Sequence, residues 1–151
     1  MNKCVNLICF PGVSTPTEAL SALRAGADGL KIFPAEMITP KILKSWKVIL
    51  PENTMLFPVG GIEPDSIETY VLAGATGFGI GSALYHPGKS VLEVVEAGKA
   101  FKKSWEKLNY HWMKATIFLY MVNIMAHQPG IEPGTYWLEV STLRVIVNTI
   151  K

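Results

Sequence analysis

The chain has 151 residues, of which 49% are hydrophobic and 17% charged, and its formal net charge is +2. This composition excludes a disordered chain, and the lysines are dispersed over predicted helices rather than gathered into the basic stripe that binds nucleic acid. The most apolar stretch, residues 115–126, is shorter than the ~20 residues that cross a bilayer, and no cleavage site follows the N-terminal apolar segment, so neither a membrane span nor a signal peptide is expected.

Strands and helices alternate four times up to about residue 108, which predicts an α/β fold. The expected strands are residues 7–13, 29–34, 55–60 and 77–82, and the expected helices are residues 15–25, 41–50, 64–74 and 90–108. Thr15 and Glu18 form a capping-box pattern at the first helix, and Ser90 and Glu93 form another at the last. Pro64 is expected at the first position of the third helix.

Helical spacing predicts which side chains face the core. In the second helix Ile42, Trp46 and Ile49 share one face. In the last helix the predicted inner face is Val91, Val94, Gly98, Phe101 and Trp105.

An internal repeat supports this division, because residues 25–32 reappear as residues 73–80. In each copy small residues end a helix and the last pair enters a strand, as in a parallel sheet. The pattern leaves a doubly wound sheet and a (β/α)8 barrel both open. From residue 109 the pattern stops, and only residues 143–150 look strand-like, so residues 109–151 are expected to form an atypical tail of unknown role.

Lys31 lies inside the apolar strand of residues 29–34, where a charged side chain is costly to bury. Burial favours the neutral amine, which is the nucleophile that adds to a carbonyl to form a Schiff base. A lysine at a strand end can also extend to water and have no chemical role. The glycine loops described next favour the reactive amine.

Two glycine loops follow the third and fourth strands. Val59 precedes Gly60 and Gly61 in the first loop, and Gly81 and Ser82 close the second. In barrel folds the loops after the last two strands bind phosphate through backbone N–H groups, and Ser82 adds a hydroxyl donor. Tight turns alone would also explain the glycines.

Other motifs point away from further sites. Residues 87–90 end like a P-loop, but Ala83 stands where that motif requires its first glycine. The histidines show no ligand spacing, so no metal site is expected. Cys4 and Cys9 are expected to be reduced core residues of a cytoplasmic protein.

The residues of these motifs resemble the second half of the 2-keto-3-deoxy-6-phosphosugar-acid aldolases, over residues 7–108. The matching segments are residues 10–12, 15–18, 30–35, 59–62 and 79–85, in the family's order and spacing. Residues 31–34 and 81–85 are closer to the 2-dehydro-3-deoxy-6-phosphogalactonate branch than to the phosphogluconate branch.

The resemblance implies a class I aldolase on a trimeric (β/α)8 barrel that splits a phosphorylated 2-keto-3-deoxy sugar acid into pyruvate and glyceraldehyde 3-phosphate, with no cofactor and no metal. Lys31 would form the imine, Pro11 and Phe33 would line the pyruvyl pocket, and Val59 would contact the substrate at the mouth of the phosphate-binding loop. The phosphate would bind to Gly60, Gly61, Gly81 and Ser82.

The resemblance also implies an incomplete site, because the family's proton-transferring glutamate belongs to the first half of the barrel. Residues 1–108 therefore correspond to a partial barrel, expected to be weakly active or inactive alone. Glu18 is better explained as a helix cap, and neither it nor Glu36 replaces the missing base. A non-catalytic phosphate-binding or assembly module derived from the aldolase barrel is the alternative.

Overall fold

The structure is a computed structural model that describes residues 8–109, 118–121 and 144–147. Its elements, in chain order, are β1 (Gly12–Val13), α1 (Pro16–Arg24), β2 (Leu30–Ile32), α2 (Pro40–Ile49), β3 (Leu56–Pro58), the 3₁₀ turn η1 (Pro64–Ser66), α3 (Ile67–Leu72), α4 (Val91–Asn109), β4 (Phe118–Met121) and β5 (Arg144–Val147).

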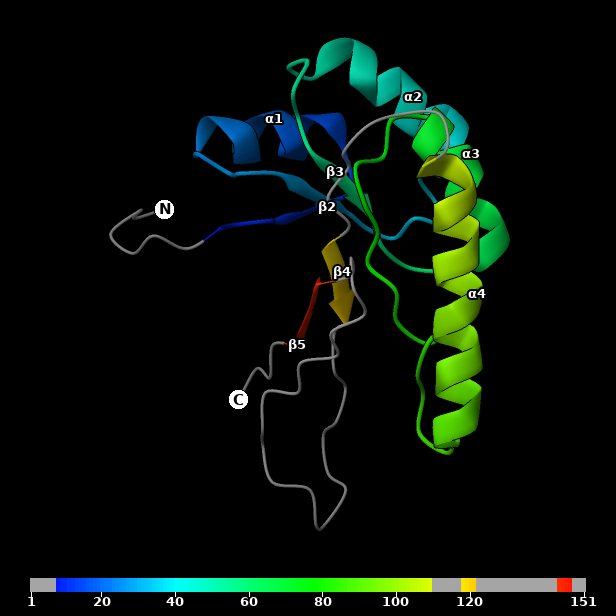
Figure 1. Cartoon of the computed structure of the whole chain (residues 1–151). Coiled ribbons are helices and arrows are strands. Elements are labelled where there is room, and N and C mark those ends of the chain that lie inside the picture. Colours follow the sequence, from blue (N-terminus) through cyan, green and yellow to red (C-terminus); the bar gives the residue numbers. More distant parts are fainter. Residues whose placement is uncertain (1–7, 110–117, 122–143, 148–151) are drawn as a thin grey trace.

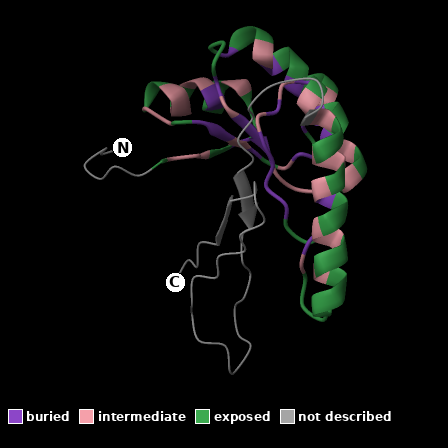
Figure 2. Cartoon of the chain, viewed as in Figure 1, coloured by how far each residue is buried: buried purple, intermediate pink, exposed green. Residues whose placement is uncertain are grey.

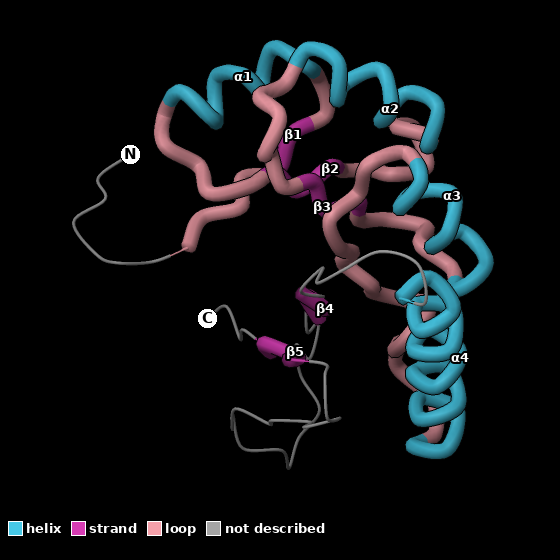
Figure 3. Tube along the Cα trace, turned by 45° about the horizontal axis from the view of Figure 1, so that its top comes forward, coloured by secondary structure: helices cyan, strands magenta, loops and turns pink. Residues whose placement is uncertain are grey.

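The three strands β1, β2 and β3 form a parallel sheet whose spatial order is the order of the chain. A parallel bridge between Val59 and Gly79 adds a fourth parallel segment, after β1, β2 and β3, at the β3 edge of the sheet. Helices α1 to α4 follow one another in an arc along one side of this sheet (Figure 1, Figure 3). Right-handed crossovers between strands added in one direction put every helix on the same face. The described strands thus form a singly wound sheet, and the order reversal of a doubly wound sheet is not seen among them.

The core lies between the sheet and the helices, where the buried residues gather (Figure 2). Leu30 and Ile32 of β2 have no exposed surface, and both point into this layer. Leu56, Pro58 and Phe78 complete the sheet side of the core. Because side chains alternate along a strand, the residue between Leu30 and Ile32 must face away from the helices.

The capping boxes predicted at the first and last helices are confirmed. At α1, the Glu18 N–H donates to Thr15 Oγ1 over 3.3 Å, while the Thr15 N–H donates to Glu18 Oε2 over 2.9 Å. Before α4, the same reciprocal pair joins Ser90 and Glu93. Pro64 begins the η1 turn that leads into α3, also as predicted. These signals are local in sequence, which is why they could be read without the tertiary structure.

The prediction for the first strand was too long, since β1 contains only Gly12 and Val13. The Asp28 N–H donates to Cys9 O and the Lys31 N–H donates to Pro11 O. Cys9 and Pro11 are two residues apart, whereas their hydrogen-bond partners Asp28 and Lys31 are three residues apart. The extra residue in the second segment interrupts the ladder in the way that a β-bulge does.

The predicted fourth strand, residues 77–82, is reduced to two bridge residues, Phe78 and Gly79, of which Gly79 pairs with Val59. Glycine at alternate positions of this segment (77, 79 and 81) provides no side chain to pack and weakens a strand. The predicted strand therefore shrinks to these two bridge residues.

The predicted face of α2 was partly wrong, because Ile42 and Ile49 are exposed. The buried positions are Leu43, Trp46 and Leu50, which are three and four residues apart. The true stripe shares only Trp46 with the predicted one.

The predicted face of α4 was wrong at its first position, since Val91 is 82% exposed. Phe101 is buried, and Val94 and Trp105 pack against the core, as predicted. Gly98 is half-buried on the same helix. The inner face of α4 thus begins one turn later than its sequence suggests.

In the C-terminal region, β4 and β5 pair in parallel as a separate two-stranded sheet. Strand β5 confirms the strand predicted within residues 143–150, and β4 lies within the apolar run of residues 115–126.

Cys4 lies outside the described residues, whereas Cys9 is half-buried with a free thiol. Within the described part of the chain, no helix is long and apolar enough to cross a membrane.

We predict that Leu43→Ala lowers the free energy of unfolding by about 2–5 kcal/mol, because it opens a cavity in the core beneath α2. Val48→Ala, on the same helix at a position that is 85% exposed, should change it by less than about 0.5 kcal/mol. Urea denaturation followed by circular dichroism measures both. Equal effects of the two substitutions would contradict the assignment of the buried face.

Candidate functional site

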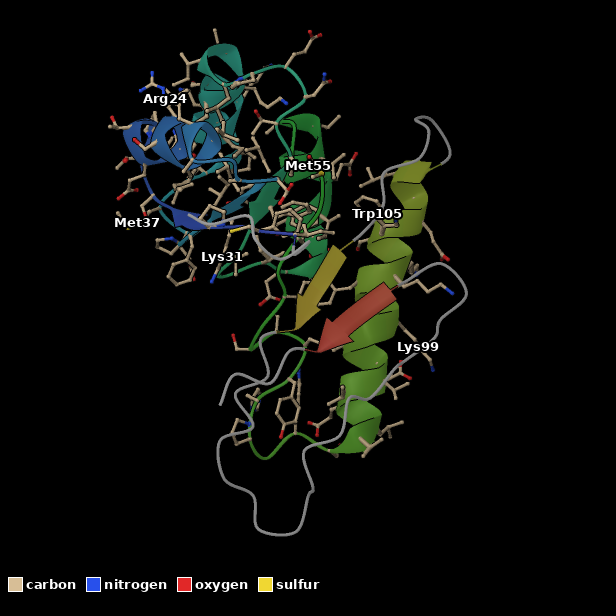
Figure 4. All side chains as sticks on the ribbon, turned by 90° about the vertical axis from the view of Figure 1, so that its left-hand side faces the viewer. Arg24, Lys31, Met37, Met55, Lys99 and Trp105 are labelled. Atoms are coloured by element: carbon tan, nitrogen blue, oxygen red, sulfur yellow. The ribbon has the colours of Figure 1, made fainter. Side chains whose placement is uncertain are left out.

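Lys31 is placed by the register of the parallel sheet. It lies opposite Gly12 of β1 on one side and Phe57 of β3 on the other. Its side chain leaves the sheet on the face opposite the helices, as Figure 4 shows. The same alternation that buries Leu30 and Ile32 therefore directs the lysine away from the core.

The Lys31 ammonium has an aromatic neighbour and no polar partner among the described residues. Its Nζ lies 4.8 Å from the centre of the Phe33 ring, a cation–π contact. The Lys31 stem runs past Gly12 of the neighbouring strand, since a Cβ added at Gly12 would lie 4.0 Å from Lys31 Cδ, an ordinary van der Waals distance. The side chain is half-buried, and Phe33 is 47% exposed, so the described residues enclose the amine on one side only.

The backbone around the lysine is tied to β1. The Lys31 N–H donates to Pro11 O over 2.9 Å, and the Phe33 N–H donates to Val13 O over 3.1 Å. The Ser14 hydroxyl donates to Phe33 O over 2.5 Å. Pro11 and Phe33 therefore flank Lys31 at the carboxyl end of the sheet, although only the Phe33 ring is seen to contact its ammonium.

The loop after β3 packs against the same aromatic ring. A Cβ added at Gly60 would lie 3.3 Å from Phe33 Cε2, and the Ala35 N–H donates to Val59 O over 2.8 Å. Gly60 and Gly61 have φ angles of 100° and 62°, which L side chains rarely adopt. The structure thus brings Lys31, Phe33 and residues 59–61 into one continuous site.

The second glycine loop lies beside the first. The Gly79 N–H donates to Pro58 O over 2.9 Å, and a Cβ at Gly79 would lie 2.5 Å from Val59 Cγ2. One helical turn follows, in which the N–H groups of Leu84 and Tyr85 donate to Gly81 O. Gly81 and Ser82 are exposed, and within the described residues their own N–H groups make no hydrogen bond. Donors of this kind are available to an anion.

The two carboxylates near the site have different surroundings. Glu18 accepts from the N–H groups of Ser14 and Thr15, and the hydrogen bonds from Ser14 and from the Thr15 side chain lower the pKa of its carboxyl. Its geometry is that of a helix cap. Glu36, by contrast, lies over the first glycine loop, since a Cβ added at Gly61 would meet its Oε1 at 2.8 Å. The amino-acid sequence does not predict this proximity, because it joins two loops that are far apart in the chain.

A buried tyrosine, also missed, stabilises the loop after β2. Tyr70 is buried on α3, and its hydroxyl donates to Ala35 O over 2.8 Å. Burial of the ring, and then the charge of Glu36, raise the pKa of this hydroxyl. Because a tyrosine hydroxyl on the buried face of a helix needs a hydrogen-bond partner, the sequence could have indicated that Tyr70 bonds to a neighbouring segment.

The P-loop-like segment of residues 87–90, which was not assigned to a site, has a structural role. The Lys89 ammonium donates to Ala83 O over 2.6 Å and to Leu84 O over 3.2 Å, which places it under the second glycine loop. Among residues 8–109, no group of three or more His, Cys, Asp or Glu side chains could hold a metal ion.

Known proteins resemble this chain over its first two thirds. The family described as "KDPG and KHG aldolase" matches residues 2–98. The chain is 41% identical over 97 residues to the 2-dehydro-3-deoxy-6-phosphogalactonate aldolase of Escherichia coli (strain K12), covering 64% of this chain and 47% of that protein. It is 42% identical over 88 residues to a probable aldolase of the same name from Rhizobium meliloti (strain 1021), covering 58% and 42%. The chain thus spans about half the length of the curated relatives it matches.

Solved structures agree with this similarity. The structure described as native KDPGal has a TM-score of 0.67 and 38% identity, and the alignment covers 70% of this chain and 51% of that one. A thiamine phosphate pyrophosphorylase from Pyrococcus furiosus has a TM-score of 0.56 and 27% identity, covering 68% and 50%. Both alignments again take about half of the other chain.

The lowered pKa of Glu18 predicts a loss of stability in acid. A carboxyl whose pKa falls on folding stabilises the native state above its unfolded value of 4.5, and this contribution disappears as the pH falls through the lower native value. We therefore expect Glu18→Gln to lower the urea midpoint at neutral pH and to converge with the unmodified protein once the pH has fallen below the lowered native pKa of Glu18. Glu52→Gln, an exposed change of the same charge, should leave the pH profile unchanged. A Glu18→Gln deficit that is independent of pH would contradict the proposed cause.

Proposed function

Because this chain belongs to the KDPG and KHG aldolase family, we propose that it is the imine-forming and phosphate-binding half of a class I aldolase. The substrate would be 2-dehydro-3-deoxy-6-phosphogalactonate, cleaved to pyruvate and glyceraldehyde 3-phosphate. The observation that carries the proposal is the contact of one aromatic ring, that of Phe33, with both the Lys31 ammonium and the glycine loop after β3.

The proposed architecture is the second half of a (β/α)8 barrel. Four consecutive parallel positions with all helices on one face are the arrangement that a barrel repeats twice. The relatives are about twice as long as the part that this chain matches, which supports the same interpretation. Residues 1–108 would form this half, and residues 109–151 would be an addition of unknown role.

The chemistry assigned to Lys31 is a Schiff-base cleavage. Its neutral Nζ adds to the C2 ketone and water leaves, which gives an iminium. The C3–C4 bond then breaks, its electron pair neutralises the iminium to an enamine, and the C4 hydroxyl loses its proton as the aldehyde forms. The enamine takes a proton at C3, and water releases pyruvate and the free lysine. The iminium accepts the electron pair, so the proposal requires no metal or cofactor.

The remaining roles follow the geometry of the site. Pro11 and Phe33 would line the pocket of the pyruvyl group, and Val59 would contact the substrate at the mouth of the phosphate-binding loop. The backbone N–H groups of Gly60, Gly61, Gly81 and Ser82 would hold the phosphate, as glycine-rich turns do for anions. The proton from the C4 hydroxyl needs a base, and Glu18 is already bonded to the α1 cap. Turnover by this chain alone would therefore be weak or absent.

The family also suggests the setting. We place the protein in the cytoplasm and expect a homotrimer when the barrel is complete, with phosphorylated keto-deoxy sugar acid, pyruvate and glyceraldehyde 3-phosphate as its small-molecule partners. No nucleic acid or membrane partner is proposed.

The imine is tested by reduction with borohydride in the presence of pyruvate. We expect one adduct, on Lys31, with the mass of pyruvate minus water plus two hydrogen atoms, located by peptide mapping. Lys31→Met should abolish the adduct, and Lys44→Met, an exposed lysine of α2, should leave it unchanged. An adduct spread evenly over surface lysines would contradict the assignment.

The alternative function is a non-catalytic phosphate-binding or assembly module, which the occupied Glu18 carboxylate favours. The two are separated by adding, in trans, a chain equivalent to the unmatched half of the Escherichia coli relative and assaying release of pyruvate. Activity that appears only in the mixture and is lost in Lys31→Met supports a split aldolase. Binding of the phosphorylated acid without adduct or turnover in the mixture supports the module.

A further inference from the structure

The Glu36 side chain covers the first glycine loop. A Cβ added at Gly60 would lie 2.8 Å from Glu36 Oε2, and one added at Gly61 would lie 2.7 Å from its Cγ and 2.8 Å from its Oε1. Both carboxylate oxygens are therefore close to the backbone that would bind a phosphate.

The backbone of the loop after β2 fixes this position. Ala35, which is 1% exposed, donates through its N–H to Val59 O and accepts at its carbonyl from the Tyr70 hydroxyl. The same hydroxyl donates to Ile38 O over 3.3 Å. Residue 36 thus lies between two anchored residues, Ala35 and Ile38, beside the glycines, and its side chain extends over them.

The carboxylate has no compensating cation in the described part of the chain. Glu36 is exposed, makes no hydrogen bond there, and forms no ion pair with Lys31 or any other described lysine or arginine. An anion bound to the Gly61 N–H would lie within a few ångströms of this charge, and two negative charges at that separation repel each other.

We propose that Glu36 determines how the glycine loop selects among anions, by opposing a phosphate dianion there more strongly than a singly charged or neutral group. The proposal rests on the phosphate-binding role given to Gly60, Gly61, Gly81 and Ser82 above. Its consequence is a loop that binds the phosphate end of a sugar acid loosely. The donors of the backbone hold the group, and the nearby carboxylate limits how tightly they do so.

The test is a titration of the full-length ¹⁵N-labelled chain with inorganic phosphate at pH 7.5 and low ionic strength, followed at the amides of Gly61 and Ser82. We expect Glu36→Gln to lower the dissociation constant about three- to tenfold, and Glu36→Lys to lower it further. The difference should narrow as salt is added, because salt screens exposed charges. Glu52→Gln, which makes the same change of net charge at the other end of α2, should match the unmodified protein.

The outcomes distinguish this inference from the function on which it rests. If the unmodified chain binds phosphate and Glu36→Gln binds it equally well or more weakly, the role of Glu36 is overturned and the phosphate loop is kept. Equal tightening by Glu52→Gln would also overturn it, since net charge would then be the cause. No response at Gly61 or Ser82 in any variant would overturn the phosphate loop and this inference together. Binding seen only in Glu36→Gln and Glu36→Lys would support it.

Discussion

The register of β2 between β1 and β3 is the constraint on which the site depends. Leu30 and Ile32 are both fully buried against the helices, so a shift of one residue would expose them and place a lysine in the core. The apolar pair therefore fixes the direction of Lys31 as firmly as any contact of the lysine itself. Gly12 on the neighbouring strand lies opposite Lys31 in the register, and the lysine stem runs past it.

The loops at the carboxyl ends of these strands are held together by backbone bonds rather than by charged pairs. Val59 accepts from Ala35, Ala35 accepts from Tyr70, and Phe33 contacts both the lysine and Gly60. Such neutral ties cost little to bury when every donor has a partner. They leave the charged groups, Lys31 and Glu36, unpaired among the described residues and free to respond to a ligand.

The parts of the structure that could be predicted are those governed by nearby residues. The caps at Thr15 and Ser90 depend on contacts three residues away, and the position of Lys31 in a strand follows from its apolar neighbours. The exposure of Val91 and the short β1 depend on how distant segments pack, which a single sequence does not show. The contact of Glu36 with Gly61 belongs to the same class, since 25 residues of chain (61 − 36) separate two loops that meet only in the folded sheet.

The described half of the site has an asymmetry that follows from its two charges. In the proposed function, Lys31 would bind the keto-acid end of the substrate, with which it forms the imine, whereas the carboxylate of Glu36 would oppose the phosphate end. An extended ligand with a carboxylate at one end and a phosphate dianion at the other would therefore be held by its reacting end and only loosely at the other. Only interactions that are stronger in the transition state than in the ground state raise kcat, so equally tight binding of a remote phosphate in both states would lower KM without raising kcat. In the proposed function, this arrangement of one amine and one carboxylate, joined by an aromatic ring and a glycine loop, would favour orientation of the reacting carbon over retention of the substrate.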